Sequence, residues 1–194
     1  MKQCLRVSRH GCQTCLTIDA MKALQPLTKV SFRDRIGLFP GVGIGLWAAN
    51  LGAQRIFGID RSCTVQKHFT SRVLHASNLI IEDECQRVRR SFAVSGGCYI
   101  NCADGLYIGA GTIFAPNVAI VSQTHDLGDL DCAPPTAGIR IGRSCWIGFS
   151  AFINPGITLG DRTVVGANSV VTQSFPEGHL IIAGAPARVV RRLS

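Results

Sequence analysis

Five histidines are the side chains of this chain best suited to carry a proton near neutral pH, and one has a distinctive setting. His125 closes the stretch SQTH and is followed directly by DLGDLDCAPPTAG, a run with two adjacent prolines and three aspartates. Histidine titrates near neutrality, so it can remove the proton of a weak nucleophile such as a hydroxyl. His125 is therefore the first candidate for a general base.

A second group that suggests chemistry is the lone C-x-x-C formed by Cys12 and Cys15. A tetrahedral zinc site needs further ligands at sensible spacing, and only Cys4 and His10 lie nearby. We predict no metal site here and interpret residues 1 to about 27 as a loosely docked arm.

The elements that must position His125 repeat with a period of six residues. An aliphatic residue returns at every sixth position from Ile141 to Val171, and four of these six residues are followed directly by glycine. Six is neither the period of an ordinary strand nor that of a helix, and a fixed short period indicates stacked coils. We expect a three-sided parallel coil in which each side takes one hexapeptide and the aliphatic side chain points inward.

The same period continues upstream with slips, and we predict repeats from about Ile59 to Ala183 with one interruption after His125. One phase comprises Ile108, Phe114 and Ile120, and a second phase, offset by two, comprises Val88, Val94, Ile100 and Leu106. Ile81 and Ile59 indicate earlier, less regular units. The fifth position of each unit is mostly small: Cys63, Cys85, Cys98, Thr112, Val118, Cys145, Ala151, Thr163 and Ser169.

Residues 1–55 lack clear repeats, so we predict an N-terminal arm and capping segment there and a single coil domain over 56–194. Residues 36–54 form an uncharged run in which Pro40 and five glycines disfavour a helix. We expect this run to cover the open end of the coil, because such ends need a cap. Peripheral membrane contact and a membrane span are the alternatives.

The formal charge of +8 favours an acidic partner. The basic residues are scattered and no aromatic residues interleave them, which argues against nucleic acid and favours a phosphorylated small molecule. No signal peptide opens the chain, and four of the nine cysteines fall at the small fifth position. We therefore expect reduced thiols and a cytoplasmic location, with membrane association if residues 36–54 touch a bilayer.

The aliphatic-Gly hexapeptides, the SQTHD stretch before an excluded loop, the IGRSCWIG that follows it and the closing AGAPARVVRR resemble the hexapeptide-repeat acyltransferases. The resemblance is strongest to the maltose/galactoside acetyltransferases and the bacterial polysaccharide O-acetyltransferases, and it covers roughly residues 59–192. It implies an all-β fold: a left-handed parallel β-helix with a short irregular or helical N-terminal segment and one excluded loop. It also implies a homotrimer, with acetyl-CoA in the cleft between subunits and His125 as the catalytic histidine.

The resemblance also suggests residues that contact the cofactor. It places Trp146 near the thioester end, Arg188 near the nucleotide phosphates, and Phe149, Ala167 and Thr172 along the pantetheine arm. Phe149 is bulkier than this role favours. Relatives usually have lysine after the Thr172 position, where this chain has Gln173.

Three residues are candidates for binding the acceptor. Asn101 and Asp104 precede His125 by about one coil of ~18 residues, so stacked coils would bring them near it. Asp126 is adjacent to His125, although neighbours on an extended chain point to opposite sides. All three have an alternative as turn residues, since Asn and Asp are favoured in turns for backbone reasons.

Together these features predict an O-acetyltransferase that moves the acetyl group of acetyl-CoA to a hydroxyl of a sugar or surface-polysaccharide precursor. His125 is the general base, and no acyl-enzyme forms. The alternatives are another acceptor on the same scaffold, namely an amino sugar, an antibiotic or serine, and a non-catalytic β-helix scaffold.

Overall fold

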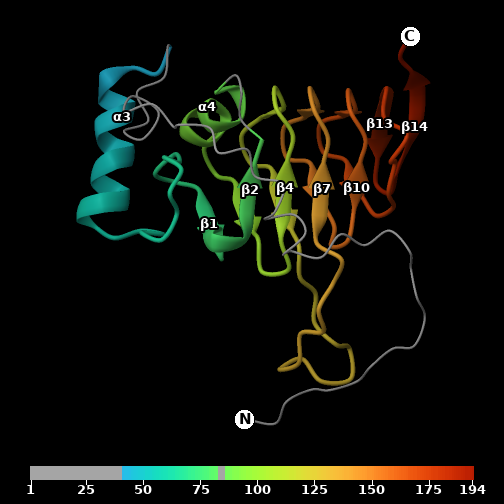
Figure 1. Ribbon diagram of the computed structural model, residues 1–194, viewed down its shortest axis with the longest axis horizontal. Coiled ribbons are helices and arrows are strands. Elements are labelled where there is room, and N and C mark those ends of the chain that lie inside the picture. The colour runs from blue at the N-terminus through green and yellow to red at the C-terminus, as the bar shows by residue number, and fades with distance from the viewer. Residues whose placement is uncertain (1–40, 83–85) are drawn as a thin grey trace.

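The computed structural model describes residues 41–82 and 86–194, and its strands form three sheets around one coil (Figure 1). From β3 to β12 successive strands enter the first, second and third sheet in turn, and all strand pairs except that of β13 with β14 are parallel. The first face holds β1 (Arg72–Leu74), β3 (Tyr99–Asn101), β6 (Ala119–Val121), β9 (Phe152–Ile153) and β12 (Val170–Val171). The second holds β2 (Leu79–Ile81), β4 (Leu106–Ile108), β7 (Ile139–Ile141) and β10 (Thr158–Leu159). The third holds β5 (Ile113–Phe114), β8 (Trp146–Ile147), β11 (Val164–Val165), β13 (Leu180–Gly184) and β14 (Ala187–Arg192). This rotation confirms the three-sided parallel coil.

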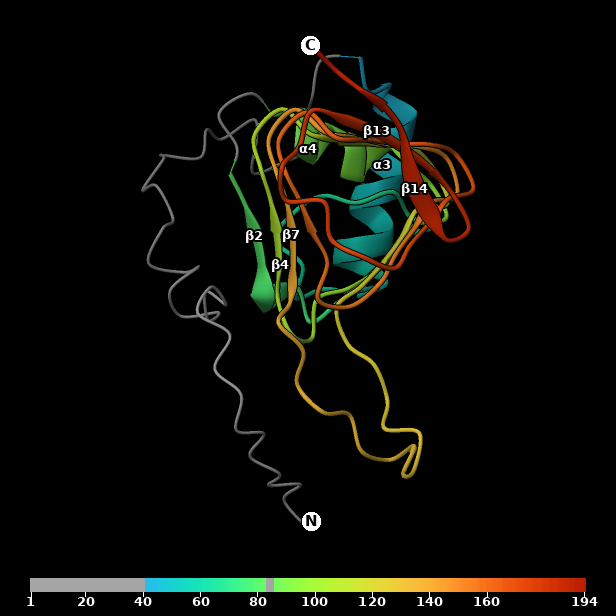
Figure 2. The ribbon, with the colours of Figure 1, turned by 90° about the vertical axis from the view of Figure 1, so that its right-hand side faces the viewer.

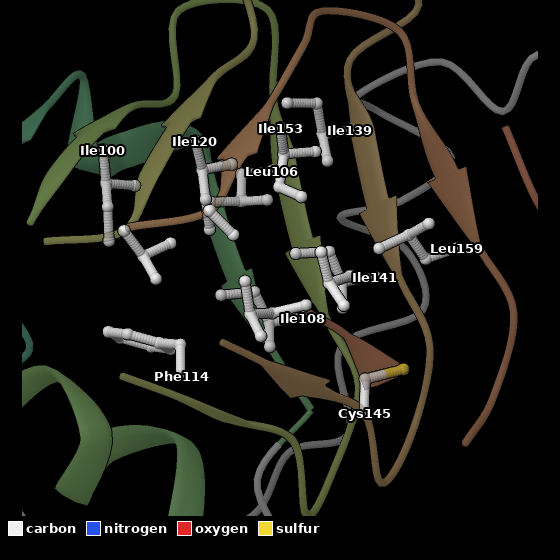
Figure 3. Close-up of a cluster of buried hydrophobic side chains, with 14 of the residues drawn as sticks. Ile100, Leu106, Ile108, Phe114, Ile120, Ile139, Ile141, Cys145, Ile153 and Leu159 are labelled. Carbon is white, nitrogen blue, oxygen red and sulfur yellow. The ribbon is translucent and has the colours of Figure 1, made fainter. Parts of the chain in front are cut away.

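The aliphatic residue of each hexapeptide points into the coil, where it stacks on the same position of the neighbouring coil (Figure 3). Ile120 pairs with Ile153, for example, and Ile147 with Val165. From Ile141 to Val171 all six are at most 1% exposed. Burial of each such side chain contributes about 1.5–3 kcal/mol of hydrophobic free energy. The small fifth positions that the structure describes are buried too: Cys63, Cys98, Thr112, Val118, Cys145, Ala151, Thr163 and Ser169.

The two-residue slip between the upstream phases lies within strand β4. Leu106 ends one phase and Ile108 begins the other, and both are buried with Tyr107 between them. Strand β7, which pairs with β4 in the next coil, repeats this arrangement, with Ile139 and Ile141 both pointing inward. A three-residue strand places residues i and i+2 on one face, so it absorbs the slip without interrupting the ladder.

A column of glycines lines the corner between the second and third faces. A Cβ on Gly142 would lie 2.7 Å from the carbonyl carbon of Gly160, and one on Gly109 would lie 2.6 Å from that of Gly142. Real Cβ atoms do not approach backbone so closely, so only glycine allows successive coils to stack at this corner.

Helix α4 (Arg87–Val94) stands between β2 and β3, where a third-face strand would otherwise lie. It packs on β5, with the Phe92 and Phe114 rings edge to face at 4.9 Å. The predicted repeat phase through Val88 and Val94 is therefore wrong: both lie on this helix, and Val94 is exposed. Val88 and Phe92 are spaced by four residues, which suits the buried face of a helix.

The predicted start of the repeats near Ile59 is also wrong. Ile59 lies in a turn and is exposed, and the first paired strand is β1, which begins at Arg72. The chain before β1 is held by side chains rather than by a strand ladder.

Helix α3 (Ile44–Leu51) and the π-helical turn η1 (Gly52–Ile56) lie at the N-terminal end of the coil (Figure 1). The buried Asn50 amide donates to the Ala93 carbonyl at 2.9 Å, and the buried Gln54 amide donates to the Cys63 carbonyl at 2.7 Å. The glycine-rich run thus contains a helix after all, bounded by Gly43 and Gly52. No helix within 41–82 or 86–194 has the length and apolarity to cross a membrane. The C-x-x-C, Cys85 and the start of the 36–54 run lie outside the described residues.

At the opposite end, β14 folds back antiparallel on β13 and forms the last strand of the third face. Arg188, Arg191 and Arg192 of β14 are exposed, and charge on an edge strand discourages pairing with other chains. The excluded loop leaves the coil between β6 and β7 and projects well away from it (Figure 2).

Candidate active site

His125 lies at the start of the excluded loop, at the corner between the first and second faces, and is exposed. Its Nδ1 is 2.8 Å from the carbonyl oxygen of Leu130. A carbonyl only accepts hydrogen bonds, so Nδ1 carries the proton of the neutral ring and Nε2 keeps its lone pair. The loop backbone thereby presents Nε2 as a base.

Hydrogen bonds within the loop keep the Leu130 carbonyl in place. The Asp126 amide donates to the Cys132 carbonyl, and the Cys132 amide donates to the Asp129 carbonyl, both at 2.9 Å. Sequence reasoning missed Leu130 as the group that orients His125. A backbone carbonyl has no residue-type signature, and only the loop conformation reveals it.

The side chain of Asp126 closes a turn within the loop. Its Oδ1 accepts the Gly128 amide at 2.7 Å, the arrangement by which Asp commonly stabilises turns. Its proposed contact with an acceptor stays a prediction.

Asp104 anchors the far end of the loop. Its Oδ2 accepts the Thr136 amide at 2.8 Å, while the Thr136 hydroxyl donates to the carbonyl of Ser122, just before His125. The Asp104 amide in turn donates to the Ser122 hydroxyl at 3.0 Å. Asp104 and Thr136 together thus tie the exit of the loop to its entrance, a structural role that the sequence did not indicate.

Asn101 lies one coil before the strand that leads to His125. It pairs with Val121, and its carbonyl accepts the Ser122 amide at 3.0 Å. Its side-chain oxygen accepts the Ala103 amide at 3.0 Å and lies 3.2 Å from Nδ1 of His75. The coil spacing therefore places Asn101 at the expected corner, together with a second histidine that sequence reasoning set aside.

The residues expected to contact the cofactor gather mostly elsewhere. Trp146 is on the third face and is 53% exposed, and Arg188 is exposed on β14 of the same face. Phe149 and Ala167 are exposed in stacked turns between the third and first faces, where the Asn168 amide donates to the Phe149 carbonyl at 2.8 Å. Thr172 is exposed just after β12, at the same corner as His125.

One chain therefore presents two separate groups of predicted residues. His125, Asn101, Asp104 and Thr172 follow first-face strands, at the corner with the second face. The other group is on the third face and at its corner with the first: Trp146, Phe149, Ala167 and Arg188. The described part of the chain does not bring the two groups together.

Comparison with known proteins supports the repeat assignment. Residues 138–173 match the family model described as bacterial transferase hexapeptide (six repeats). The galactoside O-acetyltransferase of Escherichia coli K12 is 37% identical over 94 residues, 45% of this chain and 44% of that protein. The putative colanic acid biosynthesis acetyltransferase WcaF of the same organism is 36% identical over 84 residues, 43% of this chain and 46% of that protein. These comparisons confirm the resemblance to hexapeptide-repeat acetyltransferases, although the chain spans less than half the length of each relative.

A solved structure shows the same fold at low identity. A mutant of AntD, an N-acyltransferase from Bacillus cereus, aligns with a TM-score of 0.50 and 12% identity, covering 67% of this chain and 81% of that one. At this identity the likeness concerns the fold alone.

Proposed function

We propose that this protein is an acetyl-CoA-dependent O-acetyltransferase acting on a hydroxyl of a sugar or surface-polysaccharide precursor. The observation that carries the proposal is the His125 ring, whose Nδ1 is 2.8 Å from the Leu130 carbonyl in the excluded loop, so that Nε2 can act as the base. The relatives named galactoside O-acetyltransferase and colanic acid biosynthesis acetyltransferase support the reaction and the class of acceptor.

The reaction follows from the state of that ring. Nε2 takes the proton of the acceptor hydroxyl as its oxygen attacks the thioester carbonyl carbon of acetyl-CoA. The tetrahedral intermediate collapses with cleavage of the C–S bond, and the imidazolium returns the proton to the departing CoA sulfur. A base of this kind contributes about 10²–10⁴ in rate, and a backbone N–H is the expected partner of the oxyanion.

The Leu130 carbonyl assists in two ways. It fixes the tautomer in which Nε2 is the base, and it stabilises the imidazolium by accepting from Nδ1 throughout the reaction. This is the role that a carboxylate has in other histidine-based sites, although a carbonyl carries only a partial charge.

The separation of the two residue groups leads us to propose that the site forms between subunits. His125 of one subunit would face the third face of its neighbour, which carries Trp146 and Arg188. Ile113 and Trp146 are exposed in neighbouring strands of that face, and adjacent exposed apolar side chains are typical of interaction surfaces. A left-handed coil assembled as a homotrimer is the arrangement that the family resemblance implies.

The proposed cofactor residues suit a thioester donor with a long pantetheine arm. Ala167 is small and exposed, so a ligand can approach the backbone there. Arg188 donates to the Ala187 carbonyl at 2.9 Å and is exposed, so its guanidinium can also bind phosphate. The domain division, a single coil domain from residue 56 preceded by a capping segment, remains part of the proposal.

The direct test is acceptor-dependent release of CoA thiol from acetyl-CoA over a panel of sugars, sugar nucleotides, serine and aminoglycosides. CoA binding is measured separately on the same protein. We expect CoA binding and release with at least one sugar, yielding a product with an alkali-labile O-acetyl group. An amide product would move the proposal to N-acetylation, and failure to bind CoA would favour the scaffold alternative.

A further inference from the structure

The corner that carries His125 continues toward the N-terminal end of the coil through a second polar pair. His75 directly follows β1, and Asn101 is the last residue of the neighbouring strand β3. His75 Nδ1 lies 3.2 Å from Asn101 Oδ1. His75 is exposed and Asn101 is half-buried. Neither residue belongs to the loop that holds His125.

The hydrogen bonds of this pair define its donors and acceptors. The Ala103 backbone amide can only donate, so the Asn101 atom that receives it at 3.0 Å is the oxygen. His75 Nδ1 must then donate to that oxygen, which leaves Nε2 as an acceptor in the neutral ring. Within the described residues, Asn101 Nδ2 and His75 Nε2 have no hydrogen-bond partner. The pair therefore offers an amide donor and an imidazole acceptor side by side.

This pair precedes, along the coil axis, the strand that leads to His125. Leu74 pairs with Asn101, and Asn101 pairs with Val121 in the strand that leads to His125. Adjacent strands are about 4.8 Å apart, so His75 is about 10 Å along the coil axis from the level at which the chain departs for His125. An acceptor that contacts both this pair and His125 therefore has to extend over neighbouring coils, as two linked sugar rings can.

We propose that His75 and Asn101 form an acceptor subsite for a second sugar unit, so that the preferred acceptor is a glycan of at least two units. The inference rests on the proposed function, because it takes His125 as the point at which the hydroxyl is acetylated. Each sugar hydroxyl both donates and accepts, so a vicinal pair of hydroxyls matches the His75 Nε2 acceptor and the Asn101 Nδ2 donor. A subsite of this kind favours an oligosaccharide or a growing glycan as the acceptor over a free monosaccharide.

The His75→Ala variant tests the subsite, and His179→Ala is its matched control. Both histidines are exposed and have left-handed backbones, with φ of 54° and 52°, so alanine introduces the same backbone strain at each. His179 is at the far end of the coil, in the turn before β13. The assay measures kcat/KM with acetyl-CoA for matched monosaccharides and di- or trisaccharides. Saturation-transfer NMR measures binding of the same glycans in the presence of CoA.

We expect at least one disaccharide to be a better acceptor than its constituent sugars. His75→Ala should lower kcat/KM for that disaccharide by about 5- to 20-fold, mostly through KM, as expected for one or two lost hydrogen bonds. The loss on the monosaccharides should be clearly smaller, and His179→Ala should match the wild type on both.

The outcomes separate this proposal from the proposed function. Equal loss on monosaccharides and disaccharides, or no preference of the wild type for extended acceptors, overturns the subsite and leaves the acetyltransferase standing. Disaccharide binding that depends on His75 without any acetyl transfer supports the subsite and overturns the proposed function. Absence of both binding and transfer overturns both.

Discussion

The coils that follow the excluded loop and the segment that precedes β3 are stabilised by different kinds of interaction. From β7 to β12 each side of the coil is one hexapeptide, and each buried aliphatic residue stacks on its equivalent. Before β3, helix α4 replaces a strand and buried polar side chains hold the chain. The regular half is stabilised by repeated apolar burial, and the irregular end by a few specific contacts. The candidate catalytic histidine belongs to neither region: it follows β6, where a regular strand leads into the excluded loop.

The irregular end contains a buried ion pair. Lys67 Nζ lies 3.4 Å from Asp60 Oδ2 and donates to the Ser71 carbonyl at 2.7 Å, with the two side chains 1% and 5% exposed. Asp60 also accepts the Val73 amide at 2.9 Å and the Arg72 guanidinium. This carboxylate therefore connects the turn after η1 to the first strand of the coil.

The largest effect on stability should come from neutralising that carboxylate. Asp60→Asn keeps the shape and suits the left-handed backbone at φ of 53°, but it leaves Lys67 buried without its counter-charge. We expect a loss of about 3–5 kcal/mol in unfolding free energy, measured by urea denaturation. The matched change in the regular half is Asp161→Asn, where the exposed carboxylate accepts the Arg143 backbone amide at 2.7 Å. That variant should lose about 1 kcal/mol or less, and similar losses in the two variants would contradict the contrast between the halves.

A second prediction concerns the apolar ladder. Ile153→Ala removes a fully buried side chain that pairs with Ile120, and should cost about 2–5 kcal/mol of unfolding free energy through lost burial and the cavity left behind. Ile56→Ala at the end of η1, where the side chain is 81% exposed, is the control and should cost much less. Equal costs would mean that the inward position of each hexapeptide does not dominate stability.

Much of this contrast can be predicted from the sequence. The inward aliphatic residues and the small fifth positions follow from the six-residue period, since every coil presents the same environment to them. Helix α4 was misread because Val88 and Val94 are by chance six residues apart. Asn101 could be assigned to the His125 corner by counting one coil, but its partner His75 could not, because the chain between them contains α4.

The orienting contact of His125 was beyond sequence reasoning for a different reason. The Leu130 carbonyl is a backbone atom whose position depends on the loop conformation. The anchoring of the loop by Asp104 depends on a contact with Thr136, 32 residues away. Neither contact has a residue-type pattern or a period that identifies it.

The smallest predicted effect concerns an ion pair between Glu82, which follows β2, and Arg143, which follows β7. This pair connects the two regions across the second face. Glu82 accepts from the Arg143 guanidinium and, at 2.8 Å, from the Tyr107 hydroxyl. These hydrogen bonds, that of Arg143 foremost, lower the pKa of Glu82 from 4.5 to about 2. The folded state therefore holds this proton more weakly than the unfolded chain, so the contribution is complete above pH 4.5 and is lost as the pH falls toward 2.

Glu82→Gln should accordingly flatten the dependence of stability on pH between 4.5 and 2, with only a modest loss at neutral pH, since Arg143 is largely exposed. Thermal melts across this pH range measure the effect, and Glu177→Gln at an exposed site is the control. An unchanged pH profile in Glu82→Gln would show that this contact does not couple the two halves.

The central claim is that the His125 side chain acts as the base in acetyl transfer, while the coil and the excluded loop position it. The most direct test compares acetyl transfer by His125→Ala with that of the wild type, at saturating acetyl-CoA and acceptor. Acetyl-CoA affinity and unfolding free energy are measured on both proteins. The account predicts turnover lower by about 10²–10⁴, with affinity and stability unchanged because the side chain is exposed. Turnover within a few-fold of the wild type would contradict it.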